Sequence, residues 1–402
     1  MVEAQGQYAR QSSQFLALYT LAWIGGSVAY VPFLTVLLPA RVSELAGSSA
    51  VDWLAYVSFV GAIAASIANI GFGWLSDRVR NRRAVALAGL FCSSVFLVSL
   101  GSVERFSTLL FVIALWQLSL NMMLSPLAAW AGDCVPDLQK GRLGGLLSIA
   151  PAVGAIAGII VTIPGLANSQ ERLWILALIV TVCVLPAIVF ARPHAFPGLM
   201  VSSISGGARS RGRIPVSGSV IRMWLARLLI QITEVALFAY LFLWLRSLSD
   251  AVSDNATAWV YSTVLLAGIP LAMLAGRWAD HRDKPIVPLA ACAAVVAVGL
   301  LLMGLAENLA LALAGYLVFG IGGAVFLALH SAQTLRVLPR PERRGRDLGL
   351  FNLTNTIPAL IMPWLTLALV PVFGFGGLFF LLSALAIAAF LVLFTMGAQL
   401  EG

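Results

Sequence analysis

Long stretches of apolar residues, separated by short polar segments, run through the chain from near residue 14 to near residue 398. About 20 residues at 1.5 Å per residue cross the hydrocarbon core of a bilayer, so each stretch predicts a membrane span. The stretches lack strand-like alternation and are too long for strands, which indicates helices. The twelve predicted spans are residues 14–40, 51–75, 84–103, 107–131, 144–166, 172–192, 220–247, 256–279, 285–305, 308–333, 347–371 and 376–398.

One motif occurs twice, about half a chain apart. Gly73-Trp-Leu-Ser-Asp77 is followed by a basic run, and Gly276-Arg-Trp-Ala-Asp280 is followed by Arg282 and Lys284. Each copy lies where one apolar stretch ends and the next begins. A duplicated membrane-embedded half is typical of secondary transporters, which bind their substrate between the halves.

The longest polar segment divides the predicted spans into six and six. It covers residues 193–219 and is rich in Arg, Gly and Ser, which is typical of a flexible linker. We therefore expect an N-terminal six-helix bundle over 1–192, a cytoplasmic linker over 193–219 and a C-terminal six-helix bundle over 220–402. We expect this all-α membrane protein to be a monomer.

The composition excludes a soluble globular protein. Hydrophobic residues make up 60% of the 402 residues and charged residues 10%, whereas soluble domains carry about 25% charged residues. The four cysteines lie in or beside apolar stretches without paired spacing, so they predict neither a disulfide framework nor a metal site.

The formal net charge of +8 reports membrane orientation. If the N-terminus is cytoplasmic, 20 of the 25 Lys and Arg residues fall in cytoplasmic segments. By the positive-inside rule, both termini then face the cytoplasm of a cell (inner) membrane. This distribution argues against binding to nucleic acid.

The loop between the second and third spans resembles the signature loop of the major facilitator superfamily. That motif usually reads Gly-x-x-x-Asp-Arg-x-Gly-Arg-Arg. Allowing one intervening residue, the matching positions are Gly73, Asp77, Arg78, Arg82 and Arg83. Arg80 stands where the second glycine is expected. The second copy keeps Gly276 and Asp280, but His281 replaces the arginine. The resemblance implies the six-plus-six fold and alternating access.

Two further segments resemble the glycoside–cation and sucrose–proton symporter branches of the superfamily. They are residues 126–136 and 347–352. The glycoside–cation branch usually carries acidic cation ligands within the second span. This chain has Asn69 as the most polar deep residue there, which speaks against sodium coupling.

The duplicated loop predicts a conformational latch. A small residue at Gly73 allows close approach of helices, and Asp77 can pair with a basic group on a neighbouring helix. Breaking and remaking such a pair can bias two packed arrangements. The arginines also serve as topology anchors. For Asp133 we expect a loop-stabilising pair with Lys140 or Arg142.

The seventh predicted span contains the candidates for proton coupling. Arg227, Gln231 and Glu234 are spaced i, i+4 and i+7 and so share one helix face. An isolated carboxylate in hydrocarbon is costly, and protonation or pairing removes that cost. Glu234 is therefore the predicted proton carrier, with Arg227 as its counter-charge or as a ligand for an acidic substrate group. The alternative is a structural Arg227–Glu234 pair.

Aromatic and amide side chains inside other spans are candidates for substrate binding. In the first span Tyr19, Trp23 and Tyr30 form an aromatic stripe with Ser27, which suits a sugar or a lipophilic cation as well as ordinary helix packing. The predicted substrate-binding set is Tyr19, Trp23, Tyr30, Gln117, Asn121, Gln231, Asn352 and Asn355. His330 suits either a proton relay or a satisfied interface histidine.

No phosphate-binding loop, metal-ligand cluster or nucleophile–base pair appears in the sequence. We therefore expect neither an enzyme nor a cofactor, and a proton gradient as the energy source. The favoured function is proton-coupled movement of a small organic solute, for example a sugar or glycoside. The alternatives are efflux of amphipathic compounds and a membrane assembly factor on a transporter scaffold.

Overall fold

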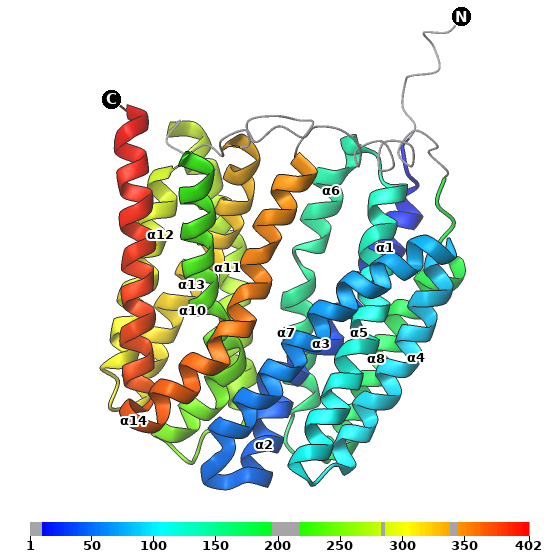
Figure 1. The fold of residues 1–402 in the computed structure, drawn as a ribbon, viewed down its shortest axis with the longest axis horizontal. Coiled ribbons are helices and arrows are strands. Elements are labelled where there is room, and N and C mark those ends of the chain that lie inside the picture. Colours follow the sequence, from blue (N-terminus) through cyan, green and yellow to red (C-terminus); the bar gives the residue numbers. More distant parts are fainter. Residues whose placement is uncertain (1–9, 195–217, 283–285, 338–343, 402) are drawn as a thin grey trace, which may run out of the picture. The chain divides into compact units, whose positions relative to one another are not determined.

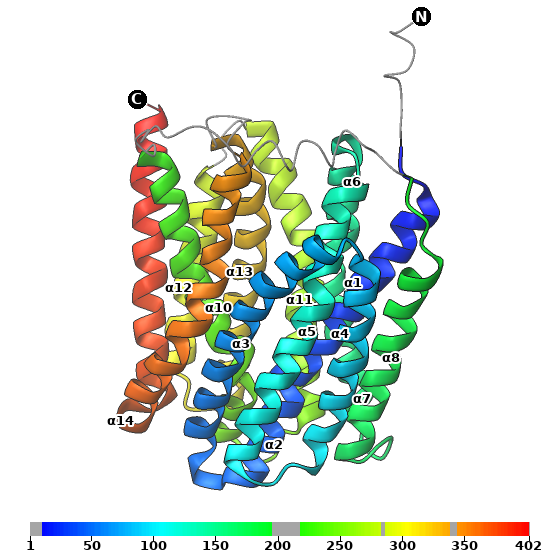
Figure 2. The ribbon, with the colours of Figure 1, turned by 45° about the vertical axis from the view of Figure 1, so that its right-hand side comes forward.

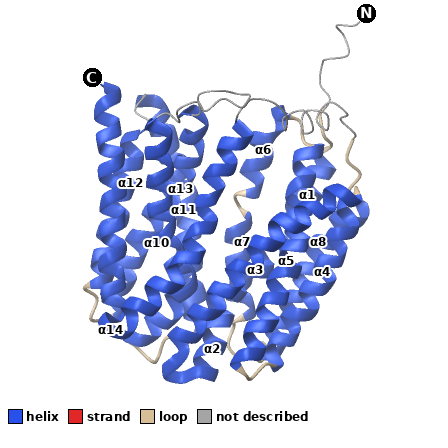
Figure 3. Ribbon diagram, viewed as in Figure 1, coloured by secondary structure: helices blue, strands red, loops and turns tan. Residues whose placement is uncertain are grey.

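A computed structural model describes residues 10–194, 218–282, 286–337 and 344–401. Helices are the only regular elements of this described part, as Figure 3 shows. Because the bilayer interior offers no water, a spanning chain must satisfy its backbone hydrogen bonds within each segment, and a helix does so.

The chain forms two compact units. The first unit comprises residues 1–33 and 60–211, and the second comprises 34–59 and 212–402. The predicted halves place residues 34–59 in the first bundle, whereas the structure groups them with the second unit. Most of the predicted linker, residues 195–217, lies outside the described residues.

The first unit contains the complete first helix, the later part of the third and five further α-helices. Its elements are α1 (Ser13–Pro32), part of α3 (Ala50–Val79), α4 (Arg82–Ser99), η4 (Leu100–Ser102), α5 (Phe106–Cys134), α6 (Asp137–Leu147), α7 (Ala150–Val161) and α8 (Ser169–Phe190). Helix α4 packs on α5 and α8, while α1 packs on α7 and α8 (Figure 1, Figure 2).

The second unit is built around α10, α12, α13 and α14. Its elements are η2 (Phe33–Leu37), α2 (Leu38–Ala46), η3 (Gly47–Ser49), the start of α3, α10 (Gly218–Leu248), α11 (Asp254–Arg282), α12 (Ile286–Gly304), α13 (Leu309–Val337) and α14 (Arg344–Glu401). Helix α12 packs on α13 and α14. Helix α10 also packs on α13 and α14, and α11 packs on α13.

Ten segments of the described residues are long and apolar enough to cross a membrane. The structure confirms the predicted all-helical membrane fold, whereas the count of twelve spans stays a prediction. Two segments are far longer than one crossing requires: Ser13–Val79 has 67 residues and Leu353–Met396 has 44. The first contains α1, α2 and α3. The second is broken at Gly374, whose φ of 65° and ψ of −175° interrupt helix α14, a conformation that only glycine adopts readily.

Local sequence signals begin several of the helices. The Ser12 side chain accepts a hydrogen bond from Phe15 N at the start of α1, and Asn81 does the same for Ala84 N at the start of α4. Asn168 and Glu171 form a complete capping box at the start of α8. Each contact satisfies backbone N–H groups that a helix leaves unpaired in its first turn.

Glycine allows one pair of helices in each unit to touch backbone to backbone. A Cβ placed on Gly89 of α4 would lie 2.7 Å from Met122 C and 2.8 Å from Met123 Cα of α5. In the second unit, a Cβ on Gly299 of α12 would lie 2.6 Å from Phe319 Cα of α13. Small residues at such crossings let dispersion forces act between backbones, which drives helix association in lipid.

We expect Gly89→Ala and Gly299→Ala to destabilise the protein by about 1–3 kcal/mol each, because the added methyl group meets backbone atoms that cannot rotate away. Gly132→Ala is the matched control, since a Cβ there meets nothing within 4 Å and gains about 1 kcal/mol of helix propensity. Thermal unfolding in detergent measures all three. Equal stability of Gly89→Ala and Gly132→Ala would contradict the described packing.

Candidate functional site

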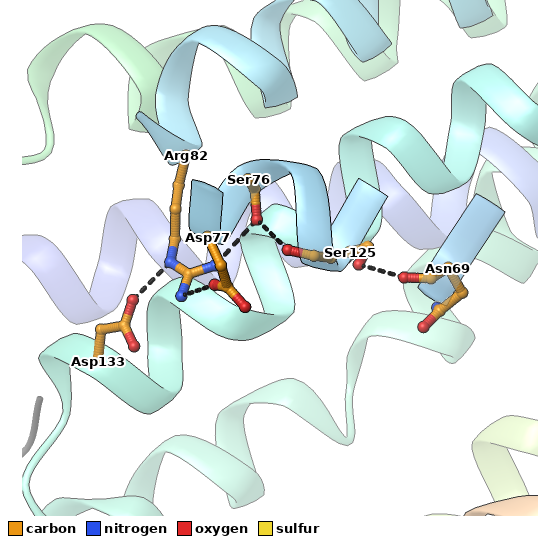
Figure 4. Close-up of polar contacts among 7 residues, drawn as sticks. Asn69, Ser76, Asp77, Arg82, Ser125 and Asp133 are labelled. Atoms are coloured by element: carbon orange, nitrogen blue, oxygen red, sulfur yellow. Dashed lines mark hydrogen bonds and ion pairs between the residues drawn. The ribbon is translucent and has the colours of Figure 1, made fainter. Parts of the chain in front are cut away.

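Arg82 is the centre of the predicted latch, as Figure 4 shows. Its Nη2 lies 2.7 Å from Asp77 Oδ1, and its Nε lies 2.5 Å from Asp133 Oδ2. Its Nη1 donates to Ser76 Oγ at 3.0 Å. One guanidinium therefore joins the end of α3 to the end of α5 and to its own helix α4. A planar fork of donors suits this role in a way that a lysine does not.

The two acids bound by Arg82 differ in exposure. The Asp77 side chain is 64% exposed, whereas Asp133 is 23% exposed and Arg82 18%. The sequence assigned Asp133 to Lys140 or Arg142, but its described partner is Arg82. The reason is the turn between α3 and α4, which the sequence pattern does not place beside α5. Asp133 is thus a member of the charge network that the motif itself did not reveal.

Gly73 supports the same junction from within the helices. A Cβ on Gly73 would lie 3.0 Å from Ser125 Oγ of α5, which itself donates to Asn69 O at 2.8 Å. The expected close approach at Gly73 is therefore present. Ser125 was not singled out from the sequence, and a hydroxyl nine residues before the end of α5 offers no signal for such a role.

The other two arginines of the motif contact aromatic rings. The guanidinium of Arg78 lies 5.4 Å from the ring centroid of Trp74, and that of Arg83 lies 5.1 Å from Trp130. Arg83 also donates to the Ala191 carbonyl. These contacts fit anchors as well as latch components.

The second copy of the motif is described only in part. A Cβ on Gly276 of α11 would lie 3.7 Å from the Leu329 side chain of α13, an ordinary contact distance. The Asp280 side chain lies outside the described residues.

Glu234 of α10 places a carboxyl oxygen among apolar helices without a donor. Within the described residues its Oε1 is buried and has no hydrogen-bond partner, and the same holds for Gln231 Oε1 one turn earlier. Tyr316 of α13 interacts electrostatically with both Glu234 and Tyr261 of α11. An unsatisfied buried oxygen is rare in proteins and calls for an explanation, such as strain or a proton.

Arg227 lies on α10 with described partners other than Glu234. Its Nε donates to Thr354 Oγ1 of α14 at 3.1 Å, and its Nη1 lies 3.5 Å from His330 Nδ1 of α13. His330 Nε2 lies 2.8 Å from the Met223 carbonyl, which only accepts. The hydrogen of the neutral ring is therefore on Nε2, and Nδ1 accepts from Arg227. His330 and Thr354 are fully buried, so Arg227 joins three helices.

The aromatic stripe of α1 is partly engaged in packing. Tyr19 is buried and donates its hydroxyl to the Leu127 carbonyl of α5 at 3.0 Å. Its ring stacks on Trp23, with centroids 6.3 Å apart. Trp23 and Tyr30 keep part of their surface exposed, and Tyr30 hydrogen-bonds Ser27. Trp23 and Tyr30 thus retain surface for a ligand that Tyr19 lacks.

The amides occupy different surroundings. Gln117 and Asn121 of α5 are each 9% exposed, and Asn121 Nδ2 donates to the Gln117 carbonyl at 2.9 Å. Gly61 of α3 faces the Gln117 side chain, with a Cβ position 3.5 Å from its Cγ. Asn355 of α14 is exposed, whereas the Asn352 side chain lies outside the described residues. The structure thus brings Gln117 and Asn121 together on one helix of the first unit.

Within the described residues, no group of three or more His, Cys, Asp or Glu side chains is arranged to hold a metal ion. What the second unit offers chemically is a carboxyl group in an apolar helix bundle. In such surroundings a carboxyl group is more stable in its neutral, protonated form than as an ion.

The long apolar helices of the described residues define an integral membrane protein. The family model of the Major Facilitator Superfamily matches residues 223–399. The human organic anion transporter MFSD10 (TETRAN) has the same fold with a TM-score of 0.63 at 16% identity, over 94% of this chain and 99% of that one. A variant of the nucleoside transporter NupG matches with a TM-score of 0.69 at 13% identity, over 95% of this chain and 99% of that one. No curated protein matches the sequence.

The family match covers the later part of the chain, and the two solved transporters share its fold. These matches support the predicted resemblance to the superfamily, and the chain has the fold of its solved transporters.

We expect Asp133→Asn to destabilise the protein by about 1–3 kcal/mol, because a hydrogen bond between charged and largely shielded groups is lost. Asp77→Asn, at a carboxylate that is mostly exposed, should cost less than about 1 kcal/mol. Chemical or thermal denaturation of the two detergent-purified variants compares them directly. A larger loss for Asp77→Asn would reverse the assigned roles.

We expect Tyr19→Phe to lower stability by about 1 kcal/mol, the usual net value of one hydrogen bond, and to leave solute transport unchanged. The reason is that the hydroxyl is engaged by the Leu127 carbonyl. Unfolding and uptake assays on the same preparation separate the two effects. Loss of transport at unchanged stability would return Tyr19 to the substrate site.

Proposed function

We propose that the protein is a proton-coupled secondary transporter of a small polar organic solute, with Glu234 as the proton carrier. The observation that carries the proposal is the buried Glu234 Oε1 without a hydrogen-bond partner in the described part of the chain. A transmembrane helix tolerates such a group in its neutral form, and a carboxyl that is alternately protonated and ionised is what coupling requires.

Arg227 has a positioning role in this proposal. It contacts Thr354 and His330, and these contacts orient one end of α10 relative to α13 and α14. Glu234 lies seven residues further, about 10 Å along the helix axis. The proton carrier and the arginine therefore act at different levels of the same helix. The arginine is also a candidate for binding an acidic group of the solute.

Side chains of the first unit provide the candidate substrate contacts. Trp23 and Tyr30 offer aromatic surface, and Gln117 and Asn121 offer amide groups inside helix α5. A ring-shaped solute with hydroxyl groups, such as a sugar or glycoside, suits this combination. The structural neighbours include an organic anion transporter and a nucleoside transporter. Each shares only the fold with this chain, and organic anions and nucleosides are therefore added to the solutes to be tested.

The proposed setting is the cell (inner) membrane, with both termini in the cytoplasm and the protein acting as a monomer in lipid. The excess of Lys and Arg in alternate loops supports this orientation. The Arg82–Asp77–Asp133 network acts as the conformational latch of the first unit. A change in the exposed Asp77 contact would alter the end of α3 while Asp133 keeps Arg82 in place.

A second candidate function is efflux of amphipathic compounds. The observation that favours it is the partly exposed Trp23 ring stacked on Tyr19, because aromatic faces attract lipophilic cations. Thermal stabilisation of the purified protein distinguishes the two. Sugars, glycosides, nucleosides and organic acids are compared with lipophilic cations at acid and neutral pH. Stabilisation by the cations alone would favour efflux.

We expect Glu234→Gln to abolish accumulation driven by a pH gradient in proteoliposomes and to spare exchange of solute across the membrane. The amide preserves the shape of the side chain but carries no exchangeable carboxyl proton. Uptake with a pH gradient and counterflow without one are measured with the solute that stabilises the protein. Loss of both activities would contradict the role of Glu234 as proton carrier.

A further inference from the structure

The Glu234 carboxyl lies directly against Gly323 of α13. A Cβ placed on Gly323 would lie 2.9 Å from Glu234 Cδ and 3.7 Å from Oε2, and it would overlap Oε1. Helices α10 and α13 pack together within the second unit. The missing side chain of Gly323 therefore leaves a niche on α13, and the buried oxygen of Glu234 occupies it.

The niche offers the carboxyl group no hydrogen bond. Within the described residues, Oε1 is buried without a donor, and it lies where a Cβ on Gly323 would be. A neutral polar group without a partner is unfavourable in such a place, and an isolated ion is far more unfavourable. The niche therefore accommodates the protonated carboxyl and excludes the ionised one.

We propose that Gly323 is a positioning residue that docks the protonated Glu234 carboxyl on α13, so that release of the proton frees the carboxyl and loosens α10 from α13. This inference rests on the proposed role of Glu234 in proton coupling. It adds the helix on which the proton acts and the structural change that follows its release. Gly323 itself carries no proton. Its role is to leave room for the Glu234 carboxyl, because it has no side chain.

Other polar and ionisable groups of the neighbouring helices have separate positions. Tyr316 of α13 interacts electrostatically with Glu234 and with Tyr261, and Gln231 precedes Glu234 by three residues on α10. Arg227 is bound to Thr354 and His330, and Arg41 and Glu44 of α2 bind each other at 3.4 Å. Helix α11 carries Asp254 in its first turn and Arg277 towards its other end, and α14 has no charged residue between Leu353 and Met396. Among the described residues of this unit, Glu234 is thus the carboxyl that lies against Gly323 of α13.

The test compares the pH dependence of thermal unfolding for the detergent-purified full chain, without any ligand. The fold accommodates the neutral carboxyl at low pH but not the ionised one, so the protein is less stable at a pH where the carboxyl of the folded state must ionise. We expect the unfolding temperature of the wild type to fall by about 2–4 °C as the pH rises from a value at which the Glu234 carboxyl is protonated to one at which it is ionised. Glu234→Gln and Gly323→Ala should both remove this pH dependence, because one removes the proton and the other fills the niche.

Two further variants control for general damage. Gly71→Ala adds the same methyl group where nothing lies within 4 Å, and it should keep the wild-type pH dependence. The double variant Glu234→Asp/Gly323→Ala shortens the acid by one methylene while adding one methyl group. We expect it to recover the pH dependence that Gly323→Ala loses, which a merely structural defect would not allow.

The two ways of failing can be told apart. If Gly323→Ala keeps the wild-type pH dependence while Glu234→Gln loses it, Glu234 titrates but the niche is not its docking site, and this inference is wrong. If Glu234→Gln keeps the wild-type pH dependence, Glu234 is not the titrating group, and the proposed proton carrier fails with it. If Gly323→Ala does not fold, the double variant Glu234→Asp/Gly323→Ala is measured instead. If that variant does not show the pH dependence of the wild type, the docking proposal is wrong.

Discussion

The absence of water from the bilayer interior is the constraint on which this structure depends. It forces the backbone into helices, since every N–H and C=O group must find a partner within its own segment. It also makes each polar side chain inside a span expensive. Glu234 is a clear example of such a costly side chain, because one of its oxygens is buried and lacks a hydrogen-bond partner in the described part of the chain. A neutral carboxyl resolves this conflict, and the position of the proton then becomes part of the fold.

In both units the helices are in close contact, which stabilises them in a bilayer interior without water. Water does not drive helix association in lipid, so small residues at the crossings let the backbones meet. Gly89 does this for α4 and α5, and Gly299 does it for α12 and α13. At Gly323 the neighbour is a carboxyl group instead of a backbone. The same device that packs a helix thereby positions a titratable group.

Much of the architecture could be predicted from the sequence. Apolar stretches of span length gave the all-helical membrane fold, and the duplicated Gly-x-x-x-Asp motif indicated the superfamily. The motif also pointed to Arg82 and Asp77, which form an ion pair. Residue spacing placed Gln231 and Glu234 on one helix, and both carry a buried oxygen without a partner among the described residues.

Contacts between distant segments could not be predicted in this way. Asp133 binds Arg82 because the turn after α3 brings α4 beside α5, and spacing along one helix is silent about such a turn. Tyr19 uses its hydroxyl on the Leu127 carbonyl, a partner 108 residues away. The role of Gly323 could not be predicted from the sequence. A glycine in an apolar stretch is usually explained by helix packing, and only the structure shows which residue faces it. The grouping of residues 34–59 with the second unit likewise depends on tertiary contacts.

The most direct test of the central claim is infrared difference spectroscopy of the carboxyl groups, recorded on the wild type and on Glu234→Gln at the same pH in lipid. The carbonyl stretch of a protonated carboxyl is separate from the bands of a carboxylate. A protonated-carboxyl band that is present in the wild type and missing from Glu234→Gln is the predicted result. Identical spectra in this region would contradict a protonated Glu234 in the niche of Gly323.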